Sequence, residues 1–181
     1  MKKAAIIQGL QTNFGTLFHV LETLPEGQLS QPLAPGKWSI GQHAKHLLLS
    51  TQPVTKGMQL PKPALLNAFG TRSERPEQSE EELVKVYLGA LAGGVKAPPK
   101  FTPEEVTEAQ KANLVADLKQ ELNDLTSTVD QWDETDLSEY VMPHPALGAL
   151  TIREMLMFTV YHTQHHTLAM QGKEQSFAKP E

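Results

Sequence analysis

Residues 151–172, which read TIREMLMFTVYHTQHHTLAMQG, contain the signals that decide the fold class. Thr151 and Glu154 have the spacing of a capping box, in which two side chains satisfy backbone groups at a helix start. Apolar and small residues then recur three and four positions apart, as on one face of an α-helix: Ile152, Met155, Leu156 and Thr159. We therefore predict a helix over residues 151–171 with one buried face.

The same face continues to two histidines, His162 and His166. They lie at positions i and i+4, so their rings can converge on one ion. A single inward histidine is usually a core residue satisfied by hydrogen bonds, whereas two buried imidazoles need partners or a cation. The pair therefore favours a metal site. His165 points about one residue away from this face, and we expect it at the surface or behind a metal ligand.

Three further stretches have helical patterns, near residues 3–24, 39–56 and 103–131. The second begins at a capping box that starts with Ser39, and the third begins at the cap Thr102, which a proline follows. Alternating strand patterns are nearly absent. Four long helices predict an all-α bundle.

The segment between the second and third long helices is less regular. Pro53 is expected to kink or stop the second helix. Residues 53–79 are rich in proline, and we predict one short helical piece at 64–69 followed by exposed loop. A capping box at Ser79 then opens a short helix that closes at a pair of glycines, 93 and 94.

The second long helix carries two more histidines, His43 and His46. His46 lies about 10 Å from the start of its helix, and His166 about 9 Å from the end of its own, at 1.5 Å per residue. If the two helices are antiparallel, these rings meet at one level. The periodicity leaves open whether His43 or His46 faces the pair, because this helix is apolar over much of its circumference.

Composition narrows the classes of protein to consider. The chain has 181 residues, no cysteine and a formal net charge of −5, which fits a single domain over residues 1–181. A nucleic-acid surface would need a basic stripe, and no apolar run approaches the ~20 residues that cross a bilayer. The start of the chain has two lysines like a signal peptide, but polar residues interrupt its apolar stretch and favour a helix. We expect a cytoplasmic location of the bacterial type.

Three segments together resemble a known family. Trp38-Ser39-Ile40 is followed, eight residues after the tryptophan, by His46 and a leucine, and Thr151-Ile-Arg-Glu154 runs into His162 and His166. His144-Pro145-Ala-Leu-Gly148 precedes the second segment. This pattern resembles the DinB/YfiT-like superfamily, in order and length over the whole chain.

The resemblance implies a four-helix bundle of up-down-down-up topology with a divalent metal held by three histidines. Carried over position by position, the metal ligands are His46, His162 and His166, which selects His46 over His43. For a hydrolase, which would need a general base near the metal-bound water, His43, His165 and His144 are the candidates, and otherwise we expect each at the surface or behind a metal ligand. Zinc is the first expectation for the metal, with nickel, iron, manganese and cobalt as alternatives.

The function implied by the resemblance is a metal-dependent enzyme acting on a small molecule. The leading hypothesis is a thiol S-transferase that uses a low-molecular-weight thiol such as bacillithiol, mycothiol or glutathione. The alternatives are a metal-dependent hydrolase and a non-catalytic metal-binding stress-response protein. We expect the acceptor to enter between the helix ends and residues 53–79, and we expect neither a nucleic-acid nor a membrane partner. The many apolar helix faces would suit a homodimer, and the two tryptophans are expected to be packing anchors.

Overall fold

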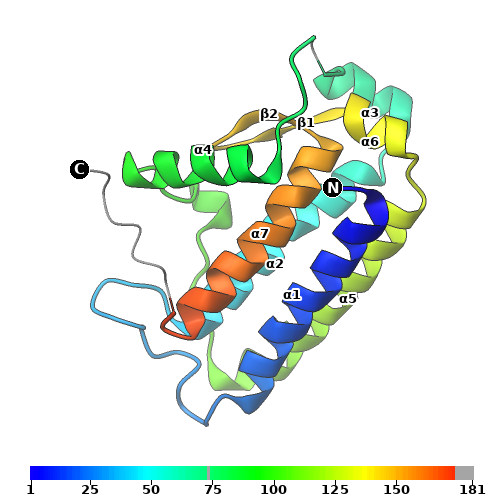
Figure 1. The fold of residues 1–181 in the computed structure, drawn as a ribbon. Coiled ribbons are helices and arrows are strands. Elements are labelled where there is room, and N and C mark those ends of the chain that lie inside the picture. The colour runs from blue at the N-terminus through cyan, green and yellow to red at the C-terminus, as the bar shows by residue number, and fades with distance from the viewer. Residues whose placement is uncertain (73, 174–181) are drawn as a thin grey trace.

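The computed structural model describes residues 1–72 and 74–173, and these fold mainly as a four-helix bundle (Figure 1). The bundle helices are α1 (Lys3–Thr23), α2 (Ile40–Met58), α5 (Lys111–Asp130) and α7 (Ile152–Met170). Helix α1 packs against α5 and α7, and α2 packs against the same two helices, so the four form a closed ring. This arrangement confirms the prediction of a bundle.

Contacts near the helix ends give the relative directions of neighbours. At the start of α1, the Lys3 ammonium donates to the carbonyl of Asp130 at the end of α5, at 2.7 Å. Near the end of α1, Glu22 pairs with Lys119 in α5 at 2.7 Å. These two helices are therefore antiparallel.

Helices α2 and α5 run in the same direction. The Thr55 hydroxyl donates to the Glu121 carboxylate. Further along in both segments, the amide of Gln59, the C-cap of α2, donates to the Thr128 hydroxyl of α5 at 3.2 Å. Glu121 is buried, and burial raises the pKa of its carboxyl above the ordinary value although the bond from Thr55 opposes this.

Helix α7 lies at the centre of the fold, and nearly all of its residues are buried. Its neighbour α1 approaches closely at Gly9, where a Cβ atom would lie 2.9 Å from the Val160 side chain. The rest of the α1 contact face is a row of fully buried apolar side chains: Ile6, Leu10, Phe14, Leu17 and Leu21. Each such side chain contributes about 1.5–3 kcal/mol to the stability of the fold when it is buried. The packing of this face of α1 therefore holds α7 in place.

The smaller elements lie at one end of the bundle (Figure 1). They are α3 (Lys62–Phe69), α4 (Glu80–Ala92), α6 (Glu134–Glu139) and the antiparallel pair β1 (Val141–His144) and β2 (Gly148–Thr151). The predicted helical piece at 64–69 and the predicted helix after Ser79 are present as α3 and α4. The strands and α6 were not predicted, because segments of four to six residues are too short to show a periodic pattern.

The predicted start of the third long helix at Thr102 is wrong. Residues 102–107 are not helical, and α5 begins at Lys111 after a capping box between Thr107 and Gln110. Short 3₁₀ turns at Pro99–Phe101 and Glu108–Gln110 flank the extended stretch. Tertiary contacts with the start of α2 hold it there, because the Gln42 amide donates to the carbonyl of Pro103 at 3.3 Å and Val106 is buried.

Of the two outcomes expected at Pro53, a stop does not occur, and α2 continues to Met58, two residues past the predicted end at 56. One expectation for residues 53–79 needs correction. The stretch after Phe69 is not simply an exposed loop, since the Arg75 guanidinium binds the fully buried carboxylate of Glu154 with bonds of 2.7 and 2.6 Å. Among the helices that the structure describes, none is both long and apolar enough to cross a membrane.

Candidate metal centre

Three buried histidines from two helices meet at one point. The Nε2 atom of His162 lies 3.3 Å from Nε2 of His46 and 3.0 Å from Nε2 of His166. The three rings offer nitrogen atoms that all lie within 4.8 Å of one another, and all three residues are buried. The structure thus brings together the residues that the family resemblance selects.

The directions of α2 and α7 create this meeting point. His43 contacts His166, and His46, one turn further along α2, contacts His162, one turn earlier in α7. The two helices are therefore antiparallel, which is the condition under which the rings were expected to meet at one level. On α7 the i, i+4 spacing places both rings on the side facing α2.

Hydrogen bonds behind the rings determine which nitrogen atoms face the centre. Nδ1 of His46 lies 2.7 Å from the carbonyl oxygen of Phe101. A carbonyl oxygen can only accept, so Nδ1 carries the proton in the neutral ring and the Nε2 lone pair points to the other two histidines. Nδ1 of His166 lies 2.8 Å from Nδ1 of His43, which leaves its own Nε2 directed at the centre.

Burial keeps these imidazoles neutral. It lowers the pKa of His162 and His166 well below 6.5, with smaller contributions from the neighbouring histidines. It also lowers the pKa of His46, although the bond to the Phe101 carbonyl opposes this. Neutral imidazole is the form that binds a metal ion.

The geometry fits a divalent metal ion. Nitrogen ligands at about 2.0–2.1 Å from a tetrahedral zinc ion lie about 3.3 Å from one another, close to the spacings of 3.3 and 3.0 Å found here. Facing lone pairs repel one another unless a proton or a cation lies between them. A site of this kind would be held by His46, His162 and His166.

The other three candidate histidines have different positions. His43 is buried and lies behind His166, where it can orient that ring. His165 is half-buried, with its ring 5.3 Å from that of His166, and it is not part of the three-nitrogen group. His144 is the last residue of β1, with its ring 4.6 Å from that of Phe158.

His144 is held in one tautomer. Its Nδ1 accepts from the backbone N–H groups of Ala146 and Leu147, at 3.2 and 3.1 Å. Burial lowers the pKa of its ring to about 4. The neutral ring therefore carries its proton on Nε2, so His144 can donate a hydrogen bond from that atom but has no free lone pair with which to act as a base.

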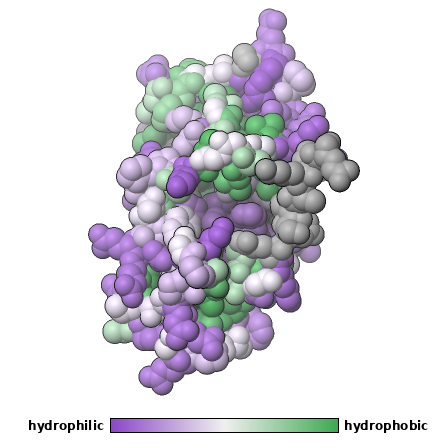
Figure 2. All heavy atoms as spheres, turned by 90° about the vertical axis from the view of Figure 1, so that its left-hand side faces the viewer, coloured by the Kyte–Doolittle hydropathy of each residue, from purple (hydrophilic) through white to green (hydrophobic). Residues whose placement is uncertain are grey.

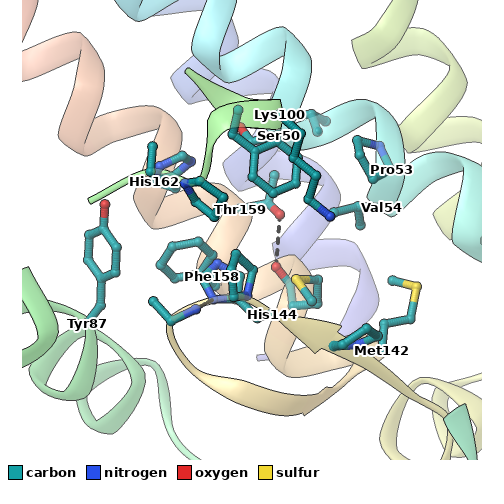
Figure 3. Close-up of a pocket in the computed structure, with 18 of the residues that line it drawn as sticks. Ser50, Pro53, Val54, Tyr87, Lys100, Met142, His144, Phe158, Thr159 and His162 are labelled. Atoms are coloured by element: carbon teal, nitrogen blue, oxygen red, sulfur yellow. Dashed lines mark hydrogen bonds between the residues drawn. The ribbon is translucent and has the colours of Figure 1, made fainter. Parts of the chain in front are cut away.

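The three-histidine group opens into a cavity of about 330 Å³ that His46 and His162 line (Figure 3). Pro53, Val54, Gly57, Leu60 and Phe69 form part of its wall, in the segment beside which the acceptor was expected to enter. The rest of the wall comes from earlier residues of α2, from α4, residues 95–101, α7 and the β1–β2 hairpin, and no local pattern in the sequence showed that these elements meet at one cavity. Tyr87, Lys100, Phe101 and Phe158 are therefore site residues that sequence reasoning missed.

The two tryptophans are packed as expected. Trp38 covers the cluster from outside, with its ring 4.9 Å from that of His46 and 6.1 Å from that of His166. Trp132 is buried and donates from Nε1 to the carbonyl of Met58 at 3.1 Å.

Replacing His43 with alanine should lower the affinity for zinc about 10- to 100-fold, because a partner that orients a ligand histidine has an effect of this size. His43→Asn keeps a hydrogen-bond acceptor and should recover part of the loss. Competition with a chromophoric chelator measures the affinity, and His19→Ala, at an exposed position in α1, is the matched control. Equal affinities of His43→Ala and the control would show that His43 does not orient His166.

The metal-free protein should lose stability as the pH falls below about 6.5. Burial lowers the pKa of His144 from 6.5 to about 4, so between these values the unfolded chain takes up a proton that the folded chain excludes. The contribution of His144 to the free energy of unfolding is fully present above pH 6.5, and at pH 5 it has decreased by about 2 kcal/mol. Urea unfolding at several pH values measures the slope, and His144→Asn should make it shallower. An unchanged slope in that variant would contradict the assignment.

Comparisons with known proteins identify relatives of this fold. The sequence model of the DinB superfamily matches residues 10–170. One similar solved structure is YfiT from Bacillus subtilis, which is described as a probable metal-dependent hydrolase with an unusual four-helix bundle topology. It has a TM-score of 0.62 and 19% sequence identity to this chain, and the match covers 94% of this chain and 85% of YfiT. TT2238, described as a four-helix bundle protein, has a TM-score of 0.57 and 18% identity, covering 94% and 98%. No curated protein matches the sequence significantly.

Proposed function

Because this chain belongs to the DinB superfamily, we propose that it is a metal-dependent enzyme that transfers a low-molecular-weight thiol to an electrophilic small molecule. His46, His162 and His166 would hold the ion. A divalent ion bound there would supply Lewis acidity, which lowers the pKa of a bound thiol or water.

The observation that carries an enzymatic role is the opening of the histidine group into the cavity. A structural metal site is closed by protein ligands, whereas a catalytic one keeps a position for substrate. In the part of the chain that the structure describes, three protein nitrogens converge, and two of the three histidines, His46 and His162, also form cavity wall. This supports a site that a small molecule can reach.

The choice of thiol over water rests on the residues around the cavity. In zinc metalloproteases a carboxylate beside the ion acts as general base for the attacking water. None of the cavity residues is Asp or Glu among those that the structure describes. His144 has its Nδ1 lone pair occupied by two backbone N–H groups. A thiol, whose pKa is much closer to neutrality than that of water, needs no such base.

The remaining side chains have identifiable tasks. The Phe101 carbonyl and His43 orient two of the rings through Nδ1. Tyr87 lies with its ring 6.0 Å from that of His162, and its hydroxyl points toward the histidine side of the cavity (Figure 3). Burial raises the pKa of Tyr87 to about 12, so the phenol stays protonated and can donate to an acceptor. Phe158 and Trp38 pack on the rings and exclude water.

The direct test is incubation of the zinc-loaded protein with glutathione, bacillithiol or mycothiol and monochlorobimane. The thiol sulfur forms a bond to carbon, chloride leaves with the bonding electrons, and the thiol proton goes to solvent. We expect at least one thiol to give fluorescent product faster than the uncatalysed reaction, and His162→Ala to remove the acceleration. Turnover of activated esters without thiol would instead support a metal-dependent hydrolase, the activity named for YfiT. Turnover of neither substrate class would support a non-catalytic metal-binding protein.

We also propose the up-down-down-up order for the four bundle helices. The antiparallel pairs α1–α5 and α2–α7 and the parallel pair α2–α5 support it.

A further inference from the structure

The cavity beside the histidines has an unusual charge for this chain. The protein carries 21 acidic and 16 basic side chains, with a net charge of −5. Among the residues that line the cavity, however, there is no carboxylate, and the formal charges come from Lys96 and Lys100. The cavity is therefore positive within an acidic protein.

These two lysines also lack acidic partners. Other lysines of the chain form ion pairs, such as Lys62 with Asp136 and Lys119 with Glu22. Within residues 1–72 and 74–173, neither Lys96 nor Lys100 has a carboxylate in salt-bridge distance. The Lys100 ammonium lies 4.8 Å from the centre of the Phe101 ring, and Figure 3 shows this side chain beside the cavity between His162 and Val54. An anion in the cavity would give Lys100 an acidic partner that it lacks among residues 1–72 and 74–173.

Most of the other side chains of the wall are apolar, with Ser50, Thr51, Tyr87 and Thr159 as the uncharged polar ones. Val54, Met142 and Phe158 are buried side chains that face the cavity. Large apolar side chains continue to its rim and stay exposed there: Leu60 (43%), Phe69 (42%), Leu91 (37%) and Val95 (44%). Figure 2 shows hydrophobic patches on the face of the molecule that carries α4. Grouped exposed apolar side chains of this kind mark binding surfaces, and a ligand with an apolar body would cover them.

We propose that the electrophilic substrate is an amphipathic carboxylate, whose apolar body lies along Val54, Met142 and Phe158 and whose carboxylate is bound by Lys100, assisted by Lys96. That this compound is a substrate rests on the proposed function. The inference adds the chemical class of the compound that binds in the same cavity. The cavity, about 330 Å³, is at the small end of the range of roughly 300–1,000 Å³ for ligand pockets. A chain of moderate length with one anionic end suits that size.

The test compares three ligands with the same eight-carbon chain and different ends: octanoate, neutral octanamide and cationic octylamine. Binding is measured by isothermal titration calorimetry on chelator-treated protein and again on zinc-loaded protein. Without metal, octanoate should bind about three- to tenfold more tightly than octanamide, and octylamine most weakly, because the carboxylate is attracted to the exposed ammonium groups of Lys96 and Lys100 and the amine is repelled. Raising the salt concentration should reduce the preference.

Substitution of each lysine tests which side chain binds the carboxylate of octanoate. Lys100→Gln should remove most of the preference for octanoate while leaving octanamide binding unchanged, and Lys96→Gln should reduce it less. Lys85→Gln, at an exposed position in α4 that does not line the cavity, is the matched control and should behave as wild type. Equal binding of octanoate and octanamide, no binding of octanoate, or an equal effect of Lys85→Gln and Lys100→Gln would overturn the proposal.

The outcome is separate from that of the proposed function. If the protein takes up no metal but the metal-free protein still prefers octanoate through Lys100, the metalloenzyme proposal fails and the ligand class stands. If thiol transfer occurs but Lys100→Gln leaves the ligand preference intact, the ligand class fails and the enzyme proposal stands.

Discussion

Replacing His162 or His166 with alanine should abolish stoichiometric binding of a divalent metal ion. Each ring supplies one of the three nitrogen atoms that lie within 4.8 Å of one another. A catalytic tetrahedral site needs three protein ligands and one position for water or substrate, and each variant would keep only two of the three histidine ligands. Metal content after dialysis, measured by inductively coupled plasma mass spectrometry, should fall from one ion per chain to near zero.

The fold should survive both substitutions, because packing of the apolar helix faces stabilises the bundle. Far-UV circular dichroism should show nearly unchanged helical content, and chelation of the wild type should shift its melting temperature only modestly. His19→Ala, outside the cluster, should bind one ion as the wild type does. Unfolding on chelation would instead indicate a structural metal, whose binding free energy is part of the folding free energy. Retention of a full equivalent of ion in His162→Ala or His166→Ala would contradict the ligand assignment.

Replacing Arg75 with alanine should destabilise the protein by about 3–5 kcal/mol, the cost of leaving a buried charge without its partner. The Glu154 carboxylate has 0% exposed side-chain area, and both its oxygens accept from Arg75. Burial alone would raise the pKa of Glu154, but the bonds from Arg75 and from the backbone N–H groups of Gln78 and Thr151 outweigh it and hold the pKa below its ordinary value. Urea denaturation at pH 7 measures the loss.

An exposed ion pair provides the comparison. Lys119→Ala removes the pair with Glu22, whose side chains are 50% and 54% exposed, and should lower the free energy of unfolding far less, because water screens an exposed pair. Adding Glu154→Gln to Arg75→Ala should recover part of the loss, since it removes the charge and keeps an acceptor for the Gln78 and Thr151 N–H groups. If Arg75→Ala costs no more than Lys119→Ala, the buried pair does not hold residues 71–79 to α7.

Local signals made α7 predictable from the sequence. The Thr151–Glu154 capping box is formed, and the i, i+4 spacing brings His162 and His166 to one centre. Both features depend only on residues within one or two helical turns. The choice between His43 and His46 was different, because α2 is buried around much of its circumference and both rings reach the cluster. Family resemblance, not periodicity, selected His46.

Features that depend on long-range contacts were not predictable. Thr102 and Pro103 have the local pattern of a helix start, but contacts with α2 hold residues 102–107 in an extended conformation. Phe101 supports His46 through a backbone carbonyl, a group that every residue has. Tyr87 and Lys100 reach the cavity only because α4 and the following loop fold across it. No pattern in the sequence distinguishes them from ordinary residues.

The most direct test of the central claim is titration of the chelator-treated protein with cobalt(II), followed by thiol, under visible and near-ultraviolet absorption. We expect one cobalt ion per chain, with the intense visible bands of low-coordinate cobalt bound to nitrogen, because three imidazoles converge with spacings of 3.0 and 3.3 Å between their Nε2 atoms. Adding the thiol should then produce a sulfur-to-cobalt charge-transfer band, absent from His162→Ala. No cobalt uptake, or a cobalt spectrum that no thiol changes, would contradict the account.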